Sequence, residues 1–343
     1  MSEDQERIRD AVQRYAAAHA EVQEAADGFV AMITALLDDA GINYVSVTGR
    51  AKSVSSFAGK AARTAPDGSP LYADPFEQIT DKLGVRVVTY LRDDVTAVAD
   101  LLSDQLSVLD DRDLGQETAR QGRFGYASRH LLVAIDRIKG APAQYDSLKG
   151  HSASVQVRTI LQHAWAEFEH DIRYKGTIPE EHVSDLDRRF TLAAGLLELA
   201  DREFSEIRHR LQATMGGGHA PPADDSDPRI SAADLTAFLA GQFTDAGWSR
   251  TDHYAWISGL LLELGITSLE ELAGLLQSID APAINARMGY RYPAGAVRRL
   301  DDALLAVFGT RYLGLHGNAH REASLRARLE KLRAAPPEAA QKG

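Results

Sequence analysis

The chain has 343 residues, enough for two domains, and its 44% hydrophobic and 25% charged residues are typical of an ordinary globular protein. Its net charge of −11 argues against indiscriminate binding to nucleic acid, and the absence of cysteine excludes disulfides and thiolate metal sites. No apolar run approaches the roughly 20 residues of a membrane span, and the charged start MSEDQERIRD is unlike a secretory signal. We therefore expect a cytoplasmic protein with no membrane partner.

The first two thirds of the chain alternate between helical and strand patterns. Residues 3–40 have apolar residues spaced by three and four, which predicts one or two helices ending near Gly41. Short apolar runs predict strands over 42–47, 85–91, 130–135 and 154–157, and a loop is expected over 108–123. Helices are expected over 93–107, 158–175 and 183–212. These elements predict a mixed α/β domain over residues 1–214.

The last third contains helical patterns only. Residues 215–229 are rich in Gly, Pro and Asp, which is typical of a flexible linker. Helices are predicted over 233–243, 253–264, 268–276, 296–307 and 320–332, and Ser268 with Glu271 predicts a capping box. We expect an all-α C-terminal domain over 230–343, whose role the sequence does not indicate.

Three stretches contain no carboxylate although the chain has 49 Asp and Glu, and all three retain basic residues. They are residues 40–66, 118–135 and 147–166. A Lys or Arg without a competing carboxylate keeps its attraction for phosphate oxygens. Buried strands also avoid acids, but burial does not explain the retained bases. We therefore expect a polyphosphate site.

The first stretch brings bases and hydroxyls to a strand end that leads into a helix: Arg50, Lys52, Ser53, Ser56 and Lys60. The N-terminus of a helix beside cations is a favourable phosphate cradle. A solvated basic helix would look the same when taken alone.

Two further residues suggest ligands. Asp81 precedes a buried strand, where its carboxylate could bind Mg²⁺ at the sheet's edge. Tyr126 follows Gly125 and could stack on a base. Taken alone, the first is equally a turn aspartate and the second an ordinary hairpin aromatic.

The helix expected after residue 158 carries a polar stripe of His163, Glu167, His170 and Tyr174. Two histidines and a glutamate so spaced could bind a metal. A polar stripe that faces a cleft needs no metal, so a metal site and a metal-free polar stripe both stay open.

Four motifs in this order resemble the synthetase domain of the RelA/SpoT alarmone synthetases. They read R-x-K-S-x-x-S-x-x-x-K, D-x-x-G-x-R, G-Y-x-S-x-H and Q-x-R-T-x-x-x-H-A-W-A-E-x-E-H-x-x-x-Y-K, and span roughly residues 40–176. The resemblance implies a nucleotidyltransferase-like sheet with flanking helices. It also implies transfer of the β,γ-pyrophosphate of ATP to the 3′-hydroxyl of GDP or GTP, with Mg²⁺ as cofactor. The N-terminal 40 residues are too few for a hydrolase domain, so the chain looks like the small single-function synthetases.

The resemblance also assigns roles to the motif residues. Those that would hold ATP and its phosphates are Arg50, Lys52 and Lys60, and Asp81 would ligate Mg²⁺. Those that would form the acceptor pocket are Tyr126, stacked on the guanine, with His130, Gln156 and Arg158. The other motif positions expected to bind substrate are Ser53, Ser56, Arg86, His163, Glu169 and Lys175.

Ser154 departs from the family pattern E-x-Q-x-R-T, whose glutamate helps to hold the metal and to deprotonate the 3′-hydroxyl. A hydroxyl is a poor metal ligand beside a carboxylate and is not a base near neutral pH. Either Glu167 or Glu169 substitutes for it, or transfer is slow or absent.

Three functions therefore stay open. The first is a synthetase of guanosine tetra- or pentaphosphate. The second is a toxin-like relative that acts on adenine nucleotides or on the 3′ end of tRNA, and the third is a degenerate nucleotide-binding regulator. A tRNA acceptor would need a basic patch, for which the candidates are Arg287, Arg291, Arg298 and Arg299, or the segment His320–Arg333, although these also fit solvated helix faces. A homo-oligomer or an antitoxin-like protein partner is compatible with all three.

Overall fold

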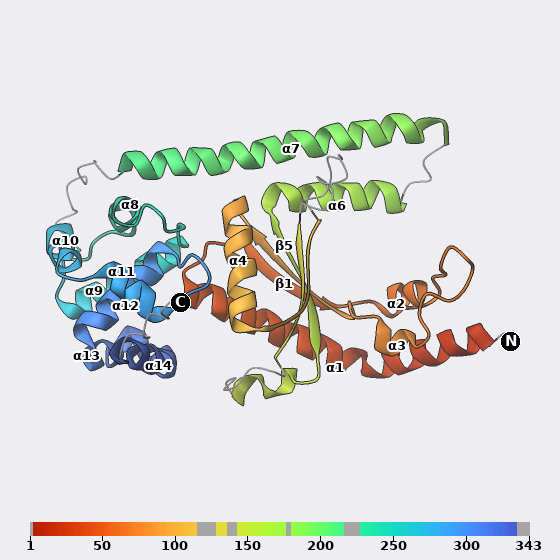
Figure 1. The fold of residues 1–343 in the computed structure, drawn as a ribbon, viewed down its shortest axis with the longest axis horizontal. Coiled ribbons are helices and arrows are strands. Elements are labelled where there is room, and N and C mark those ends of the chain that lie inside the picture. The colour runs from red at the N-terminus through yellow and green to blue at the C-terminus, as the bar shows by residue number, and fades with distance from the viewer. Residues whose placement is uncertain (1–2, 115–127, 136–142, 176–179, 216–226, 335–343) are drawn as a thin grey trace, which may run out of the picture. The chain divides into compact units, whose positions relative to one another are not determined.

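The computed structural model (Figure 1) describes residues 3–114, 128–135, 143–175, 180–215 and 227–334. The contacts within it divide the chain into two units. The sheet unit consists of residues 1–36 and 44–205, and the helical unit of residues 37–43 and 206–343. The predicted combination of a mixed α/β fold with a C-terminal all-α region is confirmed.

In its described part, the sheet unit holds five strands in the order β1-β2-β5-β4-β3. Their bounds are β1 (Ser46–Ala51), β2 (Leu83–Thr89), β3 (Ser107–Asp113), β4 (Arg129–Ala134) and β5 (Ser152–Thr159). β2 and β5 run parallel, whereas the other neighbouring pairs are antiparallel. Because side chains alternate between the faces of a strand, Val85, Val87, Val155 and Val157 are buried on one face and their neighbours lie on the other.

Two long helices cover this apolar face. They are α1 (Glu3–Ala40) and α4 (Arg92–Gln105), and α4 packs on β2, β3, β4 and β5. A Cβ at Gly49 of β1 would come within 2.6 Å of Val30 in α1, so only a glycine permits this close approach of helix and strand. The opposite face of the sheet is left for polar side chains.

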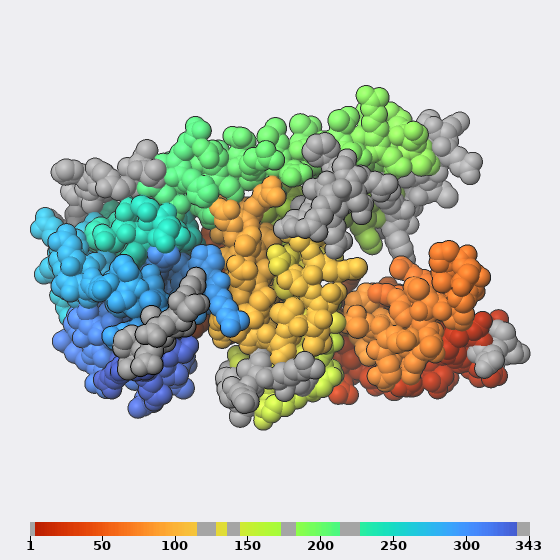
Figure 2. Space-filling model, in the orientation of Figure 1, coloured from red at the N-terminus to blue at the C-terminus, as the bar shows by residue number. Residues whose placement is uncertain are grey.

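The remaining elements of the sheet unit lie around these layers. They are α2 (Val54–Ala61), α3 (Pro75–Gln78), the 3₁₀ helix η1 (Ala143–Leu148), α6 (Ile160–Lys175) and the first part of α7 (Glu180–Met215). In Figure 2 the orange atoms of α2, α3 and the chain between them form a continuous mass beside the red atoms of α1. An ion pair of 3.0 Å between Arg14 of α1 and Glu77 of α3 joins the same segments.

Three predicted boundaries are wrong. The first strand spans residues 46–51 instead of 42–47, because pairing with β2 begins at Ser46 and includes polar residues. Residues 107–113 form the edge strand β3 where we expected a loop, since its mostly exposed, charged side chains give no apolar alternation. α6 begins at Ile160, because Arg158 and Thr159 still pair with β2.

The helical unit contains the helices α8 (Ala232–Gln242), α9 (Thr251–Leu264), α10 (Leu269–Gln277), α11 (Ala281–Met288), α12 (Ala296–Phe308), α13 (Thr310–Leu313) and α14 (Glu322–Arg333), with the 3₁₀ helix η2 (His316–Arg321). The capping box of Ser268 and Glu271 is confirmed. The helix α11 was not predicted; it is a short helix that Asp280 caps and whose first turn contains a proline. Across the residues that the structure describes, no helix has the length and apolar content of a membrane span.

The helical unit includes the C-terminal end of α1, which sequence analysis did not foresee. Gly41 takes a left-handed conformation (φ 65°), as expected of a residue that ends a helix. The last carbonyl groups of a helix have no partner within it. Here Gly295 N–H donates to the carbonyl of Ala40 (3.1 Å) and the Ser249 hydroxyl donates to that of Gly41 (2.6 Å).

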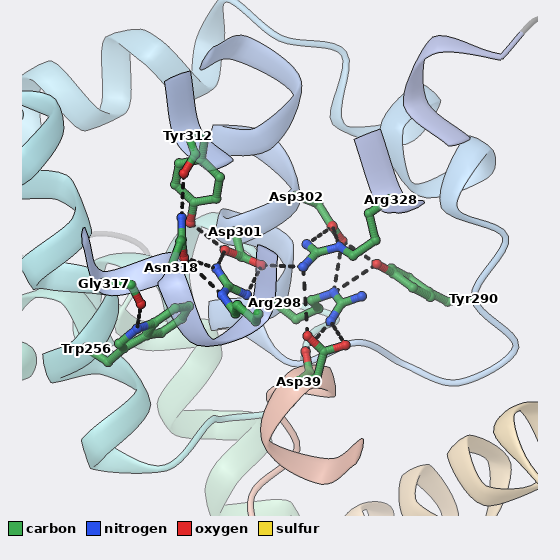
Figure 3. A network of polar contacts seen from close by, with 11 residues as sticks. Asp39, Trp256, Tyr290, Arg298, Asp301, Asp302, Tyr312, Gly317, Asn318 and Arg328 are labelled. Carbon is green, nitrogen blue, oxygen red and sulfur yellow. Dashed lines mark hydrogen bonds and ion pairs between the residues drawn. The ribbon is translucent and has the colours of Figure 1, made fainter. Parts of the chain in front are cut away.

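A buried ionic network fills the same region (Figure 3). Its carboxylates belong to Asp39, Asp301 and Asp302, and its guanidinium groups to Arg298, Arg321 and Arg328. The hydroxyls of Tyr290 and Tyr312 donate to Asp302 and Asp301. We define these six charged residues as the buried network.

Three of the arginines considered for a tRNA-binding patch are engaged within the helical unit. Arg298 is buried in the network, so it belongs neither to a surface patch nor to a solvated helix face. Arg299 pairs with Asp245 at 2.7 Å, and Arg287 donates to the carbonyl of Leu332 at 2.6 Å. These arginines hold the helical unit together.

Candidate functional site

Asp81 lies at the centre of a charged cluster on the sheet unit. Its Oδ2 is 3.2 Å from Lys52 Nζ and 2.9 Å from Lys60 Nζ. Burial alone would raise the pKa of Asp81, but the hydrogen bonds and charges of Lys60 and Lys52 outweigh burial, and the pKa is lowered. Asp81 Oδ1 is buried without a hydrogen-bond partner among the described residues. This oxygen is available to a ligand that the protein does not itself supply.

Local structure brings the two lysines to Asp81. Lys52 directly follows β1, whereas Lys60 lies in the last turn of α2. The Ser53 hydroxyl caps α2 by accepting from Ser56 N–H (3.2 Å), and the Ser56 hydroxyl lies 2.8 Å from that of Ser53. The N-terminus of α2 therefore stands beside Lys52, whereas Lys60 comes from the other end of the helix.

Two rows of side chains cross the polar face of the sheet. Strand pairing sets Thr48, Arg86, Gln156, His130 and Arg112 in one row, from β1 to β3. Residues paired directly across neighbouring strands point to the same face. The row thus unites residues from the second, third and fourth motifs, and it adds Arg112, which sequence analysis missed because it treated this segment as a loop.

The second row contains Arg50, Gly84, Ser154 and Leu132. Gly84 follows Asp81 by three residues, so Ser154 lies on the strand next to the one that Asp81 precedes. A Cβ at Gly84 would meet nothing closer than 4.0 Å, so the space beside Ser154 is open. Ser154, where the resemblance implies a glutamate, therefore lies beside this open space.

His130 is held as a neutral imidazole. Burial, together with the positive charges of Arg158 and Arg112, lowers the pKa of His130 to about 4. Its Nε2 is buried and has no hydrogen-bond partner within the described residues. Arg158 in turn donates to the side-chain oxygen of Gln156. The acceptor residues predicted on β4 and β5 are thus gathered in one place.

Glu167 of α6 faces the same side of the sheet. Its carboxylate lies 2.9 Å from Arg86 and 3.8 Å from His163 Nδ1. Burial and the charge of Arg86 lower the pKa of His163. The ion pair with Arg86 occupies the carboxylate that we considered as a substitute for the missing glutamate.

Some predicted residues have no described side-chain position. Tyr126 lies outside the described residues, and the side chain of Lys175, at the end of α6, does so too. Glu169 is half-buried on α6, while Arg50 is exposed on β1. Within the described ranges, no three His, Asp or Glu side chains are grouped to hold a metal ion, so the stripe of His163, Glu167 and His170 does not form such a site.

Comparisons with known proteins decide the family. The description "Region found in RelA / SpoT proteins" matches residues 49–178. GTP pyrophosphokinase YjbM of Bacillus subtilis is 34% identical over 171 residues, which are 48% of this chain and 72% of that protein. The chain belongs to the RelA/SpoT family. The resemblance drawn from the four motifs is confirmed.

Solved structures of family members are also similar to the chain. Small alarmone synthetase 1 from Bacillus subtilis has 25% identity and a TM-score of 0.46, covering 59% of this chain and 99% of that one. The same synthetase bound to its product pppGpp has 26% identity and a TM-score of 0.45, covering 58% and 98%. A GTP pyrophosphokinase family protein from Streptococcus pneumoniae has 28% identity and a TM-score of 0.36, covering 50% and 78%.

Proposed function

We propose that the chain is a nucleotide pyrophosphokinase that transfers the β,γ-pyrophosphate of ATP to the 3′-hydroxyl of GDP or GTP. The observation that carries the proposal is the cluster in which Lys52 and Lys60 share the single carboxylate of Asp81, on a sheet whose polar face also carries Arg86 and Arg112. Cations in excess over carboxylates attract a polyphosphate. The names of the relatives support this chemistry.

The donor side of the site is proposed to hold ATP. Lys52, Lys60 and Arg50 would contact its phosphate oxygens, and the Ser53 and Ser56 hydroxyls lie where α2 begins. Positioning and neutralisation of charge supply most of the catalysis of such transfers.

Asp81 is proposed to hold Mg²⁺. Asp81 Oδ1, which is buried and has no hydrogen-bond partner in the part of the chain that the structure describes, fits a cation, and a hard oxygen ligand suits Mg²⁺. When bound there, the ion would supply further neutralisation of phosphate charge. Lys52 and Lys60 would then contact the phosphate oxygens of ATP in place of the Asp81 carboxylate.

The acceptor side is proposed to lie along the row through Arg86, Gln156 and His130, with Arg158 behind it. A neutral His130 can donate or accept a hydrogen bond without adding charge. The further residues proposed to contact the acceptor are Tyr126, His163, Glu169 and Lys175. Stacking of Tyr126 on the base would add affinity.

Ser154 favours a second candidate, a nucleotide-binding regulator that does not transfer pyrophosphate. The site has one carboxylate at Asp81 and none at position 154, and Arg86 engages Glu167. The deprotonation of the 3′-hydroxyl then lacks an evident base. Both candidates require that the site bind nucleotides.

The test is incubation of the purified chain with Mg²⁺, ATP labelled at the γ-phosphate and each acceptor in turn: GDP, GTP, AMP, ADP and tRNA. Labelled guanosine tetra- or pentaphosphate is the expected product, resolved by chromatography. Calorimetry with ATP and GDP runs in parallel. Nucleotide binding without transfer would favour the regulator. Label on an adenine nucleotide or on tRNA would show that the acceptor is not a guanine nucleotide. If the chain neither binds nucleotides nor transfers label, both candidates are overturned.

A further inference from the structure

Tyr15 lies in α1, outside the four motifs, and is fully buried. Its hydroxyl donates to the carbonyl of Lys52 at 2.6 Å, and the carbonyl of Lys82 lies 3.3 Å from the same hydroxyl. The Lys52 N–H also donates to the Lys82 carbonyl, at 2.8 Å. One phenol thus joins the backbone after β1 to the turn that carries Asp81.

The ring of Tyr15 reaches the third segment of the cluster. It stacks on Phe57 of α2, with centroids 4.3 Å apart and planes at 19°. Phe57 is fully buried, and Lys60 follows it by one helical turn. Gln23, two turns further along α1, accepts from the N–H of Ala51 (3.0 Å) and ties the same strand end to the helix.

We propose that Tyr15 is the positioning residue of the Lys52–Asp81–Lys60 cluster and thereby sets the affinity for the phosphates of ATP. This inference rests on the proposed function of that cluster as the ATP site. The three charged side chains come from three separate segments, and the Tyr15 side chain contacts each segment or its immediate neighbour. Geometry held to a fraction of an ångström is what a polyphosphate site requires.

The hydroxyl matters more than the ring in this arrangement. Without it, the carbonyl of Lys52 would lose its side-chain donor inside the protein, which favours a shift of that segment. Burial and the charge of Asp81 raise the pKa of Tyr15 to about 12, so its hydroxyl carries a proton to donate at neutral pH.

The test compares Tyr15→Phe with Tyr254→Phe in the full chain. Both tyrosines are buried, and Tyr254 also loses one hydrogen bond, from Ser249 N–H (3.3 Å), but it lies in the helical unit. For Tyr15→Phe we expect the Kd for ATP to rise about tenfold and that for GDP to change less than about twofold. Amide hydrogen exchange should become faster over residues 50–57 and 79–84 only. Tyr254→Phe should show neither effect.

Several outcomes would overturn the proposal. Equal loss of affinity for ATP and GDP would indicate general loosening of the fold. Unchanged ATP affinity together with unchanged exchange over both segments would show that Tyr15 holds nothing in place. If the wild type binds no ATP, the proposed function fails by itself, and hydrogen exchange in the absence of nucleotide still decides whether Tyr15 positions the two segments.

Discussion

Each of the two units holds a cluster in which aspartate carboxylates contact basic side chains, one carboxylate in the sheet unit and three in the helical unit, and the two clusters differ in burial and in charge balance. In the buried network, Arg328 lies between Asp301 (2.7 Å) and Asp302, and all three side chains are at most 6% exposed. In the sheet unit, the single carboxylate of Asp81 serves two lysines that are 22% and 24% exposed.

The difference separates a structural cluster from a ligand site. Burying a charge costs several kcal/mol unless a partner compensates it, so the buried charges must be balanced. The three arginines meet Asp301 and Asp302, which are buried, and Asp39, whose side chain is 36% exposed. Burial would raise the pKa of Asp301, yet Arg328 and Arg321 hold it well below its usual range. A cluster at the surface can keep surplus cations, because water screens them until an anion arrives. We therefore interpret the charge-balanced cluster as one that stabilises the fold, and the cluster with surplus cations as one that binds an anionic ligand.

The largest expected effect comes from breaking the balance of the buried network. Arg328→Ala would leave buried carboxylates without one of their cations, which costs about 3–5 kcal/mol. Urea denaturation followed by circular dichroism should show a transition at much lower urea for the helical unit.

The control for this variant is Arg326→Ala on the same helix. Arg326 is 63% exposed and pairs with Glu322, and such a surface pair contributes at most about 0.5 kcal/mol. Equal shifts for the two variants would show that the network does not stabilise the helical unit.

The next effect should fall on activity. Asp81→Asn removes the proposed metal ligand, and we expect transfer to fall at least about 100-fold, or 2.7 kcal/mol of barrier. Stability should change by less than about 1 kcal/mol, because the two lysines are partly hydrated already.

Without Mg²⁺ the same variant should bind ATP more tightly than the wild type. The carboxylate that competes with phosphate for Lys52 and Lys60 is then absent. Calorimetry in EDTA measures this, with Asp67→Asn, an exposed carboxylate bonded to Ser69, as the control. Weaker ATP binding in EDTA would contradict the view that the cluster holds surplus cations for phosphate.

The contrast between the clusters also shows how far sequence reasoning reaches. The motif around Asp81 is local, since Lys52, Lys60 and Asp81 lie in short segments whose residue types and order indicate phosphate chemistry. The apolar runs of β2 and β4 likewise predicted buried strands. The buried network escaped prediction because Asp39 and Arg298 are distant in sequence and meet only in the folded chain.

An edge strand was the second feature that could not be predicted from the sequence. β3 has few buried side chains, so its sequence SVLDDRD carries no period-two signal, and Arg112 was not expected beside His130. The contacts of Tyr15 were invisible for a similar reason: one tyrosine in an apolar helix pattern indicates a core residue and nothing more.

A smaller effect should follow from adding a carboxylate near the Lys52–Asp81–Lys60 cluster. Ser154→Glu would supply the carboxylate that the motif resemblance implies at this position, and we expect transfer to rise about tenfold, or 1.4 kcal/mol of barrier. Gly84 on the neighbouring strand leaves room for the longer side chain.

Ser154→Gln is the matched control, since it has the same shape without the charge and should not accelerate transfer. Both variants are compared by initial rates at saturating ATP. A glutamate variant no faster than wild type, with nucleotide still bound, would mean that Ser154 does not limit the chemistry.

The smallest effect concerns the proton of His130. The ordinary pKa of a histidine is 6.5 and that of His130 is about 4, so between these values the unfolded chain binds a proton that the folded chain does not. Stability from this group is therefore unaffected above about pH 6.5 and decreases as the pH falls toward 4. At pH 5.5 the loss of folding stability, after solvent screening, should be about 1 kcal/mol or less.

Urea denaturation at pH 7.5 and 5.5 measures this loss in the wild type and in His130→Gln, which should lose less stability on acidification. His320→Gln, at an exposed position of the helical unit, should respond like the wild type. If His130→Gln also responds like the wild type, or if the His130 ring titrates near 6.5 by NMR, burial and the charges of Arg158 and Arg112 do not hold the imidazole neutral.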